Sequence, residues 1–229
     1  MMMTMMVLAL LRASEPVIAL APMTADTVAA KTLPAGRYRL DVVLTADAEL
    51  PVLGAQTTTT RSTALLTVDD KGTAHQVICA IDTAGLGFRI GARSPLPTAP
   101  AQIWVEGDVV RWDPGVLDLG WDRTRGPFPK DDKAPAAIDS DRDGKKGHGM
   151  LLDLFVLGSY QLQIASTGHS VFVGRRTPSG AAGVVRVLRA EQRVLSGAPF
   201  AATGMAVIDN GSFVLARVGD RSSCDELSL

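Results

Sequence analysis

Apolar and polar residues alternate in short segments along most of the chain after residue 36. The clearest segment runs from Arg37 to Thr45, and every second residue in it is apolar: Tyr38, Leu40, Val42 and Leu44. Successive side chains of a strand point to opposite sides, so a period of two places these four on one face. The segment therefore predicts a β-strand with one buried face.

Similar segments, rich in β-branched residues, follow at regular intervals and are bounded by turn signals. Strands are predicted over residues 57–68, 73–81, 88–90, 102–106, 109–112, 116–121, 150–157, 160–165, 170–176, 183–188, 192–195 and 212–218. The turn signals include Asp69–Gly72, Thr167–Gly168 and Asn210–Gly211. We expect about ten to twelve of these segments to form strands, which predicts an all-β fold, and we expect a single antiparallel β-barrel or a barrel-like sandwich.

A long polar loop over residues 123–149 interrupts the strands. Asp139, Asp141 and Asp143 stand there at alternate positions, and Gly144 follows them. Calcium takes about six to eight oxygen ligands in a loop that turns sharply at a glycine. The three carboxylates and the backbone carbonyl of Lys145 match the first half of a calcium-binding loop. The sequence therefore predicts a calcium ion with a structural role.

The second half of an EF-hand loop is missing. Met150 stands where the bidentate acid would be, and no helical pattern flanks the loop. A completing carboxylate then has to come from elsewhere, and we expect it from Asp153, with Asp131 and Asp132 as the other nearby acids. The alternative is an exposed polar turn that binds no ion.

The chain has two cysteines, Cys79 and Cys224, which lie far apart and outside any C-x-x-C pattern. The surroundings of the cysteines do not have the pattern of a zinc site. In an oxidising compartment, a disulfide between them would fasten the C-terminal segment to the rest of the fold. Two free thiols are the alternative.

Residues 1–30 differ in character from the rest of the chain. An apolar run over residues 1–11 and the small residues Ala19–Ala21 indicate an export signal, although no lysine or arginine precedes the run. A disordered or amphipathic arm is the alternative. We expect residues 31–229 to form one β-rich domain without a transmembrane span. The expected location is outside the cell, in the periplasm or in the cell envelope.

The charge balance argues against nucleic acid as a partner, because 23 basic residues face 24 acidic ones. The sequence contains no P-loop, no G-x-S-x-G elbow and no H-E-x-x-H motif. We expect His148, beside the aspartates, to be solvated. We expect Trp104, Trp112 and Trp121 to pack in the core rather than to line a ligand cavity.

Residues 138–176, followed by Gly211–Val218, resemble a group of secreted β-rich bacterial proteins known mostly from myxobacteria-type genomes. In that group a D-x-D-x-D-G-x-x-G loop leads into a strand, and an S-F-x-L-x-R-type strand ends the chain near a cysteine. This chain has Arg142 where a glycine is common and Lys146 where a proline is common. The resemblance implies an exported calcium-loop β-domain, lipocalin-like in outline. It implies no reaction.

Together these features predict a non-enzymatic exported protein whose calcium-stabilised barrel binds a small apolar ligand or a cell-surface partner. A lipocalin-like barrel would provide an apolar interior open at one end. One alternative is a hydrolase whose site forms around residues 123–153, where His148 and the aspartates would converge on a cavity. Another is a structural component of the cell envelope.

Overall fold

Strands make up most of the computed structural model, which describes residues 32–50, 54–85, 87–92, 95–156, 158–197 and 207–227. The strands are β1 (Gly36–Leu50), β2 (Gly54–Val68), β3 (Thr73–Gly85), β4 (Phe88–Ala92), β5 (Leu96–Pro97), β6 (Ala101–Glu106), β7 (Val109–Trp112), β8 (Val116–Leu119), β9 (His148–Leu154), β10 (Gly158–Thr177), β11 (Gly180–Ser196) and β12 (Val207–Arg217). The helices are the short 3-10 helix η1 (Arg123–Arg125) and α1 (Cys224–Leu227). The predicted export signal lies outside the described residues.

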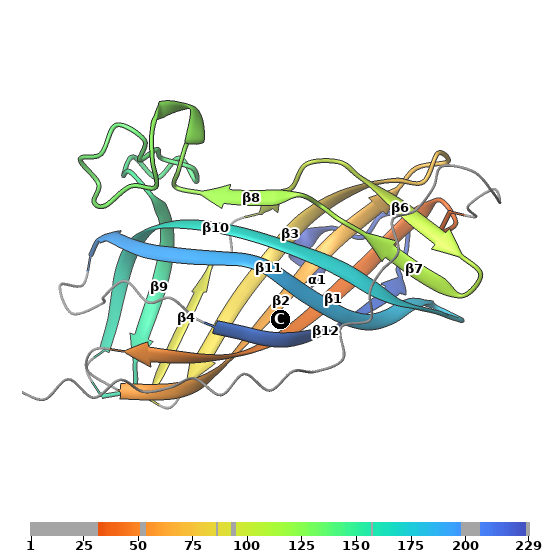
Figure 1. Ribbon diagram of the computed structural model, residues 1–229, viewed down its shortest axis with the longest axis horizontal. Coiled ribbons are helices and arrows are strands. Elements are labelled where there is room, and N and C mark those ends of the chain that lie inside the picture. The colour runs from red at the N-terminus through yellow and green to blue at the C-terminus, as the bar shows by residue number, and fades with distance from the viewer. Residues whose placement is uncertain are drawn as a thin grey trace, which may run out of the picture.

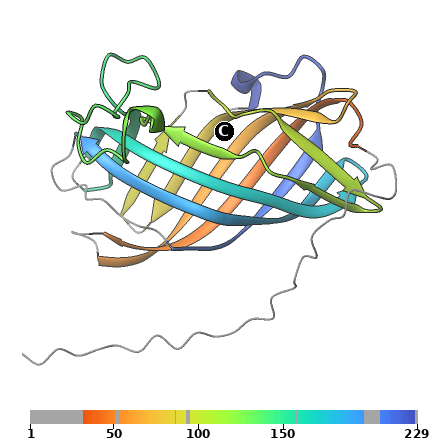
Figure 2. The ribbon, with the colours of Figure 1, turned by 45° about the horizontal axis from the view of Figure 1, so that its top comes forward.

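The strands close into an antiparallel barrel (Figure 1 and Figure 2). Neighbouring strands follow the order β11–β12–β1–β2–β3–β4–β9–β10, and β10 pairs in turn with β11. All of these pairs are antiparallel. Closure removes the free sheet edges that an open sheet would leave for other chains. The all-β prediction is confirmed.

The wall between β3 and β10 is built from different strands at its two ends. At one end β4 and β9 join β3 to β10, and at the other end β6 and β7 do so. Between them, β5 pairs with β3 and β8 pairs with β10. Among the described residues, β5 and β8 do not pair with each other. The ladder of main-chain hydrogen bonds is therefore interrupted between β5 and β8.

Apolar side chains fill both ends of the barrel interior. Near β6 and β7, the Trp112 ring stacks on Phe172 with centroids 4.3 Å apart and meets Phe213 edge-on. Near β4 and β9, a second cluster contains Met150 and Leu152 of β9. Burial alternates along the strands as the period-two pattern predicted, because the inward face of a barrel strand carries every second side chain.

Three strands are longer than the sequence pattern suggested. Thr167–Gly168 lies inside β10, β11 is continuous where two strands were predicted, and Asn210–Gly211 lies inside β12. The predicted turns were wrong there. A Cβ on Gly211 would lie 2.2 Å from Cδ2 of Leu44, so this glycine makes room for a neighbouring side chain and does not reverse the chain.

The long loop between β8 and β9 packs on the outside of the barrel (Figure 1). Trp121, Ala136 and Ala137 of the loop form an apolar cluster with Ala165 of β10 and Leu195 of β11. The Trp121 indole Nε1–H also donates a hydrogen bond within the loop. These contacts fix the loop beside one end of β10.

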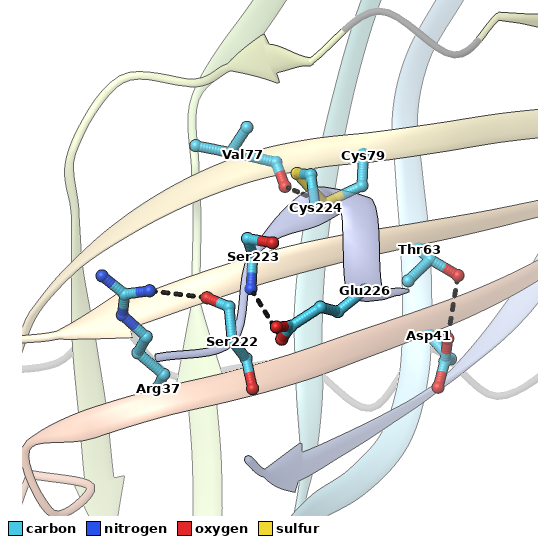
Figure 3. Close-up of a disulfide and its surroundings, with 9 residues drawn as sticks. All are labelled: Arg37, Asp41, Thr63, Val77, Cys79, Ser222, Ser223, Cys224 and Glu226. Carbon is cyan, nitrogen blue, oxygen red and sulfur yellow. Dashed lines mark hydrogen bonds between the residues drawn. A yellow bond between two sulfur atoms is a disulfide. The ribbon is translucent and has the colours of Figure 1, made fainter. Parts of the chain in front are cut away.

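Cys79 and Cys224 form a disulfide, and their Cα atoms lie 5.1 Å apart. Figure 3 shows how this bond joins α1 to β3 on the outer face of the barrel. Cys79 lies at a bulge, where the β2–β3 register shifts between Thr63 and Ala64. Arg37 of β1 donates a hydrogen bond of 2.5 Å to the carbonyl oxygen of Ser222. The C-terminal segment is thus fastened across the outer face of β1–β3.

Candidate functional site

The structure brings Asp139, Asp141 and Asp143 together. One carboxylate oxygen of each lies within 4.8 Å of the others. The loop that carries them begins and ends side by side, since Asp139 forms a bridge with Gly147 and the Ser140 N–H donates to the Gly147 carbonyl at 3.0 Å. The alternate spacing in the sequence therefore becomes a compact acidic group.

Main-chain N–H groups hold these carboxylates in place. Asp139 accepts hydrogen bonds from Asp143 N at 3.2 Å and from Gly144 N at 2.9 Å. Asp141 Oδ2 accepts from Gly149 N at 2.8 Å. Burial acts to raise the pKa of Asp139, but the main-chain hydrogen bonds, chiefly that from Gly144, outweigh it and hold the pKa below its ordinary value. Asp139 is therefore ionised at neutral pH.

Within the described part of the chain, two oxygens at this group have no hydrogen-bond partner. Asp141 Oδ1 is buried without a hydrogen-bond partner among the described residues. Gln163 of β10 is 2% exposed and donates from Nε2 to Asp143 Oδ2 at 2.8 Å, while no described residue bonds to its own Oε1. Unpaired buried oxygens destabilise a fold. Carboxylate and amide oxygens are the ligands that hard cations prefer, so the three aspartates can hold a metal ion.

The two other predicted ligands lie differently. Asp153 is near the far end of β9, where its carboxylate accepts a hydrogen bond from the Ser159 hydroxyl, and it is not part of the acidic group. Lys145 is in the loop, where its N–H donates to Asp143 Oδ1 at 2.8 Å and its Nζ donates to Gln161 Oε1 at 3.0 Å. The Lys145 carbonyl as a ligand stays a prediction.

His148, which we expected to be solvated, is 0% exposed. The expectation was wrong because the loop folds over the start of β9. His148 Nδ1 lies 3.2 Å from Ser140 Oγ, and Ser140 Oγ accepts a hydrogen bond from Gly120 N at 3.1 Å. Burial lowers the pKa of His148 and outweighs the nearby carboxylates, so the ring is neutral at neutral pH. A buried imidazole of this kind ties the loop to β9 and is closed to a substrate.

A cavity of about 140 Å³ lies inside the barrel. Apolar side chains of five strands line it: Leu40, Val42 and Leu44 of β1, Ala64 of β2, Ile78 of β3, Phe172 of β10 and Val185 of β11. The lining also includes Thr98, just after β5, and Pro114, Gly115 and Leu117, at and before β8. The lining thus includes both segments that border the opening in the hydrogen-bond ladder between β5 and β8, so the cavity lies beside this opening in the side wall of the barrel.

The rim of this opening is held in place by Asp113. Its Oδ1 accepts hydrogen bonds from Gly115 N at 2.7 Å and from His169 Nε2 at 2.8 Å. On the opposite rim, Thr98 N donates to the Gln76 carbonyl oxygen at 2.9 Å. Each rim segment is thus bound to the long strand beside it.

Polar groups are few in the cavity. Ser62, Gln76, Thr98 and Ser170 are among the lining residues, and the described lining contains no charged side chain. Gln76 is 7% exposed, and its Oε1 is buried without a hydrogen-bond partner among the described residues. The cavity is therefore mostly apolar and uncharged, and one residue of its lining, Gln76, has an unsatisfied side-chain oxygen.

The tryptophans do not line the cavity. Trp112 and Trp121 are buried in apolar clusters, as expected, whereas Trp104 is 48% exposed. The residues that do line the cavity have no motif in the sequence. They come together only because the barrel closes. The sequence offered one indication of them, which was their position on the inward face of a predicted strand.

The sequence matches no protein-family model and no curated protein significantly. Among solved structures, the chain is similar to DynF from the dynemicin biosynthesis pathway of Micromonospora chersina. The two share 12% sequence identity at a TM-score of 0.38, over 90% of this chain and 93% of DynF. In the described part of the chain, no helix is both long and apolar enough to span a membrane.

Proposed function

We propose that the protein is a non-enzymatic, exported β-barrel that binds a small apolar ligand in its interior. The observation that carries the proposal is the uncharged cavity of about 140 Å³ inside the barrel, beside β5 and β8. A cavity of about 150 Å³ lined by aliphatic and aromatic side chains is large enough for benzene. Binding sites for small molecules are concave and mostly apolar with a few polar groups, which fits this lining. Lipocalin-like barrels use their interior in the same way.

A hydrolase site around residues 123–153 has less support. His148 is fully buried, and the aspartates accept hydrogen bonds from the main chain of their own loop. Neither His148 nor the aspartates line the interior cavity. The proposed site is therefore the cavity, and the acidic loop has a structural role.

Toluene is a suitable first probe, because it is about the size of the cavity and uncharged. Titration of the full chain, followed by amide NMR, is expected to shift signals of residues around Ala64, Phe172 and Val185. Ser62→Leu places a larger side chain in the cavity and is expected to abolish these shifts. Ser212→Leu, on the exposed face of β12, is the matched control and should bind as the wild type does. Equal binding by both variants, or no shift in the wild type, would contradict the proposal.

The proposal includes a calcium ion held by Asp139, Asp141 and Asp143. The ion would compensate three close negative charges and contact the unpartnered Asp141 Oδ1. Calcium is preferred to magnesium here because carboxylate and carbonyl ligands from an irregular loop suit its larger and less regular coordination shell. The Lys145 carbonyl is the further ligand that the loop pattern suggests.

Calorimetric titration tests the ion. We expect calcium to bind the wild type with a dissociation constant in about the micromolar to millimolar range. At about one hundred times that concentration, calcium should stabilise the fold by about 2.7 kcal/mol, seen as a higher melting temperature. Asp141→Asn should abolish both effects. Asp131→Asn should leave them intact, because the Asp131 carboxylate accepts hydrogen bonds from Lys133 N and Ala134 N in another turn of the loop and is outside the acidic group. Absence of heat and of a melting shift in the wild type would refute the calcium site.

Export is supported by the disulfide between Cys79 and Cys224, because disulfides persist in oxidising compartments. The apolar N-terminal segment would then serve as the signal. Cell fractionation followed by mass analysis of the mature N-terminus tests this. Recovery of the uncleaved chain in the cytoplasm would contradict it.

A further inference from the structure

We propose that Gln76 selects ligands that carry one uncharged hydrogen-bonding group, so that the cavity takes small phenol-like or alcohol-like molecules in preference to pure hydrocarbons. This inference rests on the proposed function, since it concerns the same cavity.

The position of Gln76 is the first support. Burial along β3 places Ala74 and Gln76 on the inward face of the barrel, and Gln76 lines the cavity. The main chain of Gln76 is paired with Leu66 of β2 on one side and bound by Thr98 N on the other. The side chain is therefore carried by a fixed strand just inside the opening between β5 and β8.

The unmet hydrogen bond is the second support. Gln76 is 7% exposed, and its Oε1 has no partner among the described residues. A buried amide oxygen without a partner is destabilising, whereas an apolar residue of similar shape would have no such cost. Oε1 is enclosed in the structure without a ligand, so the Gln76 amide has to turn towards the cavity before a ligand can reach this oxygen. A ligand that then donates a hydrogen bond to it removes the cost. A hydroxyl suits the position because it can both donate and accept.

The rest of the lining defines the remainder of the ligand. Phe172, Val185 and Ile78 offer apolar contact area, and the described lining contains no Lys, Arg, Asp or Glu. A charged ligand would lose its hydration there without gaining a partner charge. The ligand is therefore neutral, apolar over most of its surface and about one aromatic ring in size at its buried end.

Phenol and toluene form a matched pair of probes, since they differ by a hydroxyl in place of a methyl group. Both are titrated by NMR into the full-length wild type and into Gln76→Leu. In the wild type, phenol should bind more tightly than toluene. In Gln76→Leu, the toluene dissociation constant divided by the phenol dissociation constant should fall about tenfold, because loss of one buried hydrogen bond changes an affinity by about that factor. Comparing ratios cancels the different solubility of the two probes in water.

Further measurements test whether a change in the ratio comes from the lost hydrogen bond and not from altered packing. Gln76→Met, closer in shape to glutamine, should show the same fall in the ratio. In the wild type, the side-chain amide signals of Gln76 should shift with phenol more than with toluene. Ser62→Leu should lose both probes, which locates them in the cavity.

The outcomes separate the two proposals. If toluene and phenol bind but their ratio is unchanged in the Gln76 variants, and the Gln76 amide signals do not distinguish them, the role of Gln76 is refuted and the binding cavity stands. If neither probe binds the wild type, the cavity proposal fails and this inference fails with it.

Discussion

Arg123 of η1 contacts residues that lie on different segments of the chain. Its guanidinium donates to both carboxylate oxygens of Asp118 in β8 and to Thr167 Oγ1 of β10 at 2.8 Å, and it lies over the Trp121 ring. Burial acts to raise the pKa of Asp118, but hydrogen bonds, chiefly that from Arg123, outweigh it and lower the pKa. One ion pair thus holds the start of the long loop against the barrel.

Asp118→Asn is expected to destabilise the fold by about 1 kcal/mol at pH 7, a modest value because Arg123 is partly exposed. The folded pKa of Asp118 lies below the unfolded value of about 3.9, so the charge stabilises the fold above about pH 4. This contribution is lost as the pH falls through the folded pKa.

The free energies of unfolding of the wild type and of Asp118→Asn, measured in urea, should therefore differ at neutral pH and become equal in acid. Asp108→Asn, which breaks the exposed pair with Arg175, should show no measurable change at either pH. A difference for Asp118→Asn that persists at low pH would contradict the argument.

At the scale of elements, close contact between β10 and β11 depends on two glycines. Gly174 pairs with Gly183 across the two strands. A Cβ on Gly174 would lie 2.4 Å from the Ala182 carbonyl oxygen and 2.7 Å from Phe213 Cζ. Without that Cβ, the Phe213 ring reaches the Trp112 ring with centroids 5.1 Å apart. The glycine pair therefore allows the aromatic cluster at this end of the barrel to form.

Gly174→Ala is expected to destabilise the fold by about 1–3 kcal/mol, because either the backbone at Ala182 or the Phe213 ring must move to make room for the methyl group. Gly168→Ala is the matched control on the same strand, since a Cβ there meets no atom within 4 Å. Its effect should stay within about 0.5 kcal/mol. Guanidinium unfolding of both variants gives the comparison. Equal losses would mean that close packing at Gly174 is not the cause.

At the scale of the whole molecule, distant parts of the chain close the barrel. β1 pairs with β12, and the disulfide joins residues 145 positions apart. Long-range pairing of this kind carries a large loop-closure entropy, which a crosslink removes from the unfolded state. The disulfide thus closes a long loop of the unfolded chain, while α1 itself is a single short turn on the outer face.

Cys224→Ser is expected to lower the free energy of unfolding by about 4–5 kcal/mol, the chain-entropy value for a loop of this length. The barrel should remain cooperative, because the strands and their interior packing are untouched. Denaturant titration of the oxidised wild type, the reduced wild type and the variant provides the measurement. The reduced wild type should match the variant. A loss below about 1 kcal/mol would show that the unfolded chain is already compact.

Much of the architecture follows from the sequence, because alternation is a local property. Tyr38, Leu40 and Val42 are buried on one face of β1 as their spacing predicted. The alternate aspartates were also a local signal, since Asp139, Asp141 and Asp143 meet within a single loop. Glycine was ambiguous, because Gly211 in β12 has the same sequence signature as a turn.

Other features depended on contacts between segments that are distant in the sequence. The burial of His148 required the loop to fold back over β9, and the cavity required Gln76, Phe172 and Val185 to be brought together from three strands. Nothing local distinguishes Gln76 from an exposed glutamine on the outer face of a strand. The sequence by itself determined the strands and the acidic loop, whose signals lie within a few residues. Only barrel closure decided which side chains share the interior, because that depends on register and on the interruption between β5 and β8.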